Sequence, residues 1–156
     1  MASENDEKAI QEEFLASWDE LEKFFVRLFF MLPIGDVDTE TMLGLIAELR
    51  PLGLLPIKDV ENKKAMLDVI IELRQKGCDR QFRAGQSLDM LKLSRSREHG
   101  LRNDQAWVGM FLIPESGMRV VYSAPPNEWI EVDLEKVEVT PEVEELLQRL
   151  LSHPID

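Results

Sequence analysis

The chain has 156 residues, 44% of them hydrophobic, and its 18 basic and 30 acidic residues give a formal net charge of −12. This length and hydrophobic content allow a buried core, which argues against intrinsic disorder despite the charge. A single cysteine excludes a disulfide scaffold within the chain. The longest apolar run, residues 24–32, is far shorter than the roughly 20 residues that cross a membrane. We therefore expect one cytoplasmic domain over residues 1–156, with no membrane contact.

Helical signals dominate the first two thirds of the chain. Residues 1–15 are polar and are expected to fray. Ser17 and Glu20 have the spacing of a capping box, and apolar residues then recur every three or four positions, so we predict a helix over residues 17–32. Three further helices are expected, at residues 39–50, 60–76 and 88–98.

The hydrophobic pattern changes period after residue 106. Residues 107–113 are apolar at nearly every position, which is typical of a strand buried on both faces. A turn with a glycine leads into a second strand at residues 118–122. Residues 129–134 then alternate between apolar and charged or aromatic side chains, which predicts a third strand with one face toward the core.

A last helix is expected over residues 141–151, because Thr140 is a suitable N-cap and Pro141 suits the first helical turn. The predicted fold class is α+β. Its helical part, of about four to five helices, occupies residues 17–100, and its small antiparallel sheet of about three strands occupies residues 106–139.

The charge is unevenly distributed. Residues 1–22 contain eight acids and one base, and residues 128–145 repeat that ratio. Residues 74–102 have the opposite sign, with eight bases against three acids and a net charge of +5. The rest of the chain has a net charge of −17. Such block asymmetry is evidence about partners and solubility rather than about fold.

Two interpretations of the basic window stay open. In the first, its side chains neutralise the acidic stretches of the same molecule, since charge runs on a surface usually have no specific partner. In the second, the window binds an anion, with His99 as an acid or base beside the arginines. The structural alternative for His99 is a charged side chain at a helix end. The candidate anion-binding residues are Arg80, Arg83, Lys92, Arg95, Arg97, His99 and Arg102.

The sequence contains no complete catalytic, metal-binding or phosphate-loop motif. One cysteine and two distant histidines cannot supply a structural zinc site, and the glycines are scattered singly. Cys78 is expected to be a buried, unreactive thiol. We therefore expect no cofactor and no metal, and a protein that is not an enzyme.

These observations predict an interaction protein, such as an adaptor, an inhibitor or an immunity-type binder, whose acidic surface meets a basic protein. Aromatic side chains within a charged rim often concentrate binding energy. The interface candidates are Trp18, Trp129, Glu128, Glu131 and Asp133. Two alternatives remain: binding of nucleic acid or a phosphorylated ligand through residues 80–102, and a homodimer that pairs the basic segment with an acidic block.

Overall fold

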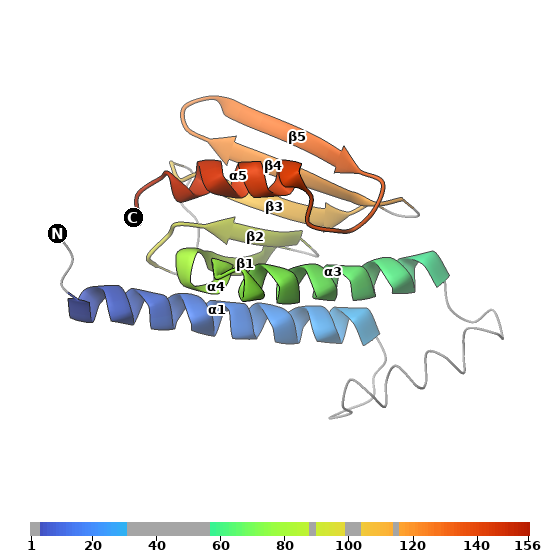
Figure 1. Ribbon diagram of the computed structural model, residues 1–156, viewed down its shortest axis with the longest axis horizontal. Helices are drawn as coiled ribbons and strands as arrows, with labels where there is room; N and C mark the ends of the chain where they lie inside the picture. Colours follow the sequence, from blue (N-terminus) through green and yellow to red (C-terminus); the bar gives the residue numbers. More distant parts are fainter. Residues whose placement is uncertain (1–3, 31–56, 88–89, 99–103, 114–115) are drawn as a thin grey trace.

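The computed structural model describes residues 4–30, 57–87, 90–98, 104–113 and 116–156. It has the expected α+β class: along the chain, N-terminal helices are followed by an antiparallel sheet and then by a C-terminal helix (Figure 1). The described elements are α1 (Glu4–Phe30), α3 (Ile57–Gln75), α4 (Cys78–Gln81), β1 (Arg83–Ser87), β2 (Met90–Ser94), β3 (Trp107–Leu112), β4 (Met118–Ala124), β5 (Glu128–Leu134) and α5 (Pro141–Leu151). The helix predicted over residues 39–50 lies outside the described residues.

α1 is one continuous helix, so the predicted start of a helix at Ser17 is wrong. The Ser17 hydroxyl does not cap a helix but links α1 to the sheet. It donates to the Phe14 carbonyl at 2.6 Å and accepts from the Ala84 N–H at 2.9 Å. Pattern alone could not reveal this role, because the second partner lies far along the chain.

The sheet has five strands in the order β1-β2-β3-β4-β5, all antiparallel, so the predicted count of three is too low. The helix predicted over residues 88–98 is also wrong, since β2 occupies part of that range. Leu91 and Leu93 are fully buried while Lys92 between them is half-buried, which is the two-residue period of a strand. β1 contains Ala84 and Gly85, whose low strand propensity makes the strand hard to recognise in the sequence.

The predictions for residues 60–76, for the three strands and for the last helix agree with the structure. α3 covers the helix predicted over residues 60–76, and Gly77 behind it adopts a left-handed φ of 90°. β3, β4 and β5 match the three predicted strands. The Thr140 hydroxyl accepts from the Val143 N–H at 3.4 Å at the start of α5.

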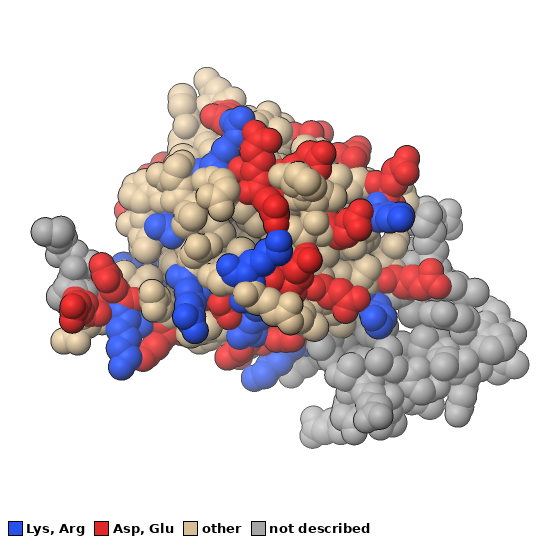
Figure 2. Space-filling model, viewed as in Figure 1, with Lys and Arg blue, Asp and Glu red and all other residues tan. Residues whose placement is uncertain are grey.

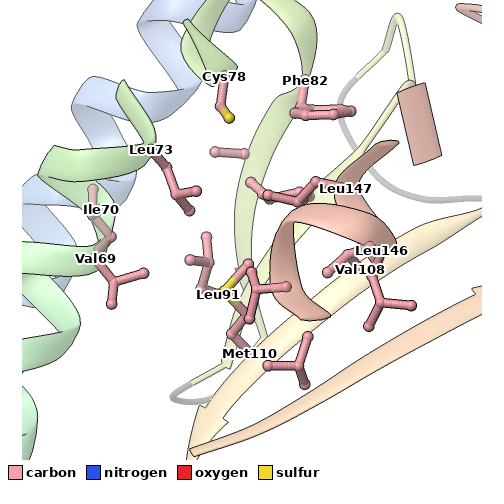
Figure 3. Packing of buried hydrophobic residues seen from close by; sticks show 14 of the residues in the cluster. Val69, Ile70, Leu73, Cys78, Phe82, Leu91, Val108, Met110, Leu146 and Leu147 are labelled. Atoms are coloured by element: carbon pink, nitrogen blue, oxygen red, sulfur yellow. The ribbon is translucent and has the colours of Figure 1, made fainter. Parts of the chain in front are cut away.

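One face of the sheet forms the core with the helices. Figure 3 shows side chains of α3, β2, β3 and α5 pointing toward one another. α3 and α5 supply, among others, Ile70, Leu73, Leu146 and Leu147 to this cluster. The buried residues on the core face of β1 to β4 are Ala84, Leu91, Leu93, Val108, Met110, Met118, Val120, Tyr122 and Ala124.

The two edges of the sheet differ. α1 runs beside β1 (Figure 1), and the Trp18 indole N–H donates to the Phe82 carbonyl at 2.9 Å just before that strand begins. β5 forms the opposite edge and pairs only with β4 within the described sheet. Among the described helices, none is long and apolar enough to span a membrane.

Candidate interaction surface on the open sheet face

The face of the sheet opposite the core carries two tryptophans in contact. Strand register places Trp107 of β3 and Trp129 of β5 on either side of Ser123 of β4. Because Ser123 is small, the two indoles meet above it, with ring centroids 5.8 Å apart and planes at 85°. Trp129 keeps 57% of its surface exposed, an unusual fraction for so large an apolar side chain.

A glycine lets Trp107 lie across the sheet. A Cβ added to Gly109 would lie 2.7 Å from Met90 Sδ and 2.9 Å from Trp107 Cζ3, so a larger residue would lift the indole. The Lys92 ammonium sits 4.2 Å from the centroid of the Trp107 ring, in a cation–π arrangement. Burial lowers the pKa of Lys92. We call Lys92, Trp107, Arg119, Trp129, Glu131 and Asp133 the tryptophan surface.

Acids line the β5 side of this surface. Glu131 and Asp133 are exposed and alternate with Trp129 along the strand. Arg119 of β4 donates to both oxygens of Asp133, at 2.7 and 3.1 Å. These hydrogen bonds and the charge of Arg119 lower the pKa of Asp133. The Asp133 carboxylate is therefore charged at neutral pH and is paired with Arg119.

The other two interface candidates differ from this group. Glu128 is exposed on β5, and its ion pair with Arg149 of α5 at 3.2 Å places it on the helix-covered side of the strand, not on the open face. Trp18 is fully buried in the core, so it offers no surface to a partner. The helical spacing of Trp18 was compatible with either location, because a helix that is apolar on much of its circumference does not reveal which side meets a partner.

Much of the basic window is neutralised within the molecule. Arg74 donates to Glu22 at 2.8 Å, to Asp19 at 2.9 Å and to Asp79 at 3.3 Å. Lys76 forms an ion pair with Glu144. Two of these acids belong to the N-terminal acidic block and one to the C-terminal block. The contacts of Arg74 and Lys76 therefore favour the self-neutralising interpretation for this part of the window.

Arg83 and Arg95, both anion-binding candidates, are engaged with backbone carbonyls. Arg83 donates to the carbonyls of Ser96 and Arg97 and reaches Glu13 at 3.4 Å. Arg95 donates to the Gln81 carbonyl at 2.6 Å and the His153 carbonyl at 3.0 Å. Burial lowers the pKa of the Arg95 guanidinium. These two arginines tie segments of the chain together instead of facing one open surface.

The other anion-binding candidates are dispersed. Arg80 and Arg97 are exposed, one on α4 and the other after β2. Lys92 belongs to the tryptophan surface. His99 and Arg102 lie outside the described residues. Figure 2 shows acidic and basic side chains interspersed over the molecular face that carries α5, with no large region of one sign.

His153 and Cys78 are of residue types that often react in active sites, but both have structural positions here. His153 is half-buried, and its Nε2 lies 2.9 Å from the Tyr122 hydroxyl, so its side chain is held against the sheet. Cys78 is buried in the core, and burial together with the charge of Asp79 raises the pKa of its thiol to about 11. The described residues contain no cluster that could hold a metal ion.

We expect the Cys78 thiol to react slowly with an alkylating reagent in the native protein. At pH 8 the thiol is uncharged, because its raised pKa of about 11 keeps the proton bound, and the thiolate is the nucleophile. Labelling should be at least about tenfold slower than in urea-unfolded protein at the same pH. Equal rates would contradict the buried position of this side chain.

Comparison of the chain with protein-family models, with curated proteins and with solved structures found no match.

Proposed function

We propose that the protein is a non-enzymatic interaction protein that binds a basic partner through the tryptophan surface. The observation that carries the proposal is the 57% exposure of Trp129 on an edge strand between acidic neighbours. Large aromatic side chains are enriched among residues that dominate interface energies. Glu131 adds a negative charge beside Trp129 that would attract and orient a basic segment, whereas the Asp133 carboxylate is already paired with Arg119.

The charge of the whole chain supports a basic partner. A net charge of −12 raises the encounter rate with a cation and opposes approach of a polyanion such as nucleic acid. The internal contacts of Arg83 and Arg95 also remove two of the donors on which the nucleic-acid alternative depended. A homodimer between basic and acidic segments loses support for the same reason.

The Trp129→Ala variant tests this proposal. We expect it to weaken binding of fluorescent lysine- and arginine-rich peptides about 10- to 30-fold, which corresponds to about 2 kcal/mol for an interface anchor. Fluorescence anisotropy measures the affinity at low and high salt. The wild-type affinity should fall as salt rises, because exposed charges are screened.

A pair of charge-matched variants serves as the control. Glu131→Gln removes a carboxylate beside Trp129, whereas Glu12→Gln removes an exposed carboxylate on α1. We expect weaker binding for the first and unchanged binding for the second. Equal affinity for basic peptides, acidic peptides and single-stranded oligonucleotides, or affinity insensitive to Trp129→Ala, would refute the proposal.

A further inference from the structure

β5 leaves one side of its backbone without a strand partner in the described sheet. The opposite edge is blocked, because α1 lies along β1 and Ser17 accepts the Ala84 N–H. β5 runs for seven residues without proline or glycine. In an edge strand, every second residue directs its N–H and C=O away from the sheet, where another strand can pair with them.

The core-facing side chains of β5 are incompletely covered. Ile130, Val132 and Leu134 are only partly buried. Their register partners on β4, which have strands on both sides, are 0 to 3% exposed: Tyr122, Val120 and Met118. Apolar side chains of an added strand would lie beside these three residues, cover them, and extend the hydrophobic core by one strand.

The other side of β5 has a different chemistry. Trp129, Glu131 and Asp133 alternate along it on the open face. Side chains directly opposite one another on neighbouring strands interact, so a cation is favoured beside Glu131 and its apolar stem beside the Trp129 ring. β5 therefore offers apolar positions on one face and acidic and aromatic positions on the other.

We propose that an extended partner segment, alternating basic and apolar residues, adds to the sheet as a sixth strand alongside β5. This inference rests on the proposed function and specifies how the basic partner binds. Backbone hydrogen bonds supply affinity in strand addition, and alternate side chains supply specificity. The segment directs its basic side chains to the open face and its apolar side chains to the helix-covered face.

A second copy of this chain is a poor occupant of the same edge. Pairing two β5 strands would bring Glu131 and Asp133 of one copy near the acids of the other, and like charges on adjacent strands are destabilising. The same acids thus disfavour self-association at an edge that would otherwise invite it. Charge complementarity selects a basic strand from outside the molecule.

The test uses the full chain and a capped heptapeptide, Lys-Val-Lys-Thr-Lys-Val-Lys, followed by residue-resolved amide hydrogen exchange. We expect alternate amides of β5 to exchange at least about tenfold more slowly with saturating peptide, as new backbone hydrogen bonds form. The amides of α1, on the far edge, should keep their rates. Two comparison peptides are a scramble with its lysines contiguous and an analogue with alternate backbone nitrogens methylated.

The possible results distinguish strand addition at β5 from the more general proposal that the protein binds a basic partner. Strand addition predicts that methylation of the set of peptide nitrogens facing β5 reduces affinity at least about tenfold, while methylation of the other set does not. Binding that depends on Trp129 but survives both methylation patterns, without alternating protection of β5, would overturn strand addition and leave the proposed function standing. Absence of binding by every basic peptide would overturn both. Sedimentation of the free protein as a dimer with β5 amides already protected would assign the edge to a second copy.

Discussion

Replacement of Trp18 by alanine is expected to destabilise the protein by about 3–5 kcal/mol, the usual cost of truncating a fully buried large aromatic side chain. Trp18 has no exposed surface, and its indole N–H is the donor to the Phe82 carbonyl between α1 and the start of the sheet. The alanine variant loses both the packing and this hydrogen bond. Urea unfolding followed by far-ultraviolet circular dichroism measures the change in the free energy of unfolding.

Trp18→Phe and Trp129→Ala are the appropriate comparisons. Phenylalanine keeps most of the apolar volume and loses the donor, so its cost should be about 1–3 kcal/mol. Trp129→Ala removes the same side chain from an exposed position and should change the unfolding free energy by less than about 1 kcal/mol. Similar costs at positions 18 and 129 would contradict the assignment of one tryptophan to the core and the other to a binding surface.

Gly117→Ala, just before β4, is expected to be strongly destabilising. The new Cβ would lie 1.8 Å from the Leu134 carbonyl oxygen and 2.6 Å from the Glu135 carbonyl carbon, both backbone atoms. The start of β4 and the end of β5 would have to move apart, so we expect a loss of about 3 kcal/mol in unfolding free energy. Thermal or urea unfolding measures it.

Gly85→Ala is the matched control for this substitution. A Cβ at Gly85 meets no atom within 4 Å, so the same methyl group is accommodated on β1. Alanine also restricts the unfolded chain more than glycine, and the variant should be neutral or more stable by up to about 1 kcal/mol. Equal destabilisation by the two variants would show that the close approach of Gly117 to β5 is not the cause.

The parts of the fold that were predictable carry their signal locally. Thr140 and Pro141 mark the start of α5, and strict alternation marks β5. The wrong predictions concern segments whose structure depends on contacts with residues far away in the sequence. Leu88 and Leu91 are spaced as on a helix face, yet β2 forms because Leu93 and Leu91 face the core between two paired strands. Ser17 matches a capping box, but Ala84 uses its hydroxyl from 67 residues away.

The candidate site was predictable to a similar degree. The alternation around Trp129 already placed it with Glu131 and Asp133 on one side of a strand. The contact between Trp129 and Trp107, and the position of Lys92 over Trp107, depend on strand register and on Ser123 and Gly109 being small. Register across three strands has no local signature in a single sequence.

The links between α1 and the rest of the molecule have a kinetic consequence. Ser17 contacts Ala84, Trp18 contacts Phe82 and Glu13 contacts Arg83, so these three hydrogen bonds join α1 to residues more than 60 positions later. Contacts between residues so far apart in sequence slow folding, because the chain loses the entropy of closing a long loop before the contacts can stabilise it. During synthesis, the part of α1 that packs against Phe82 and β1 will therefore stay exposed until β1 has emerged, and the nascent chain is prone to aggregation in that interval.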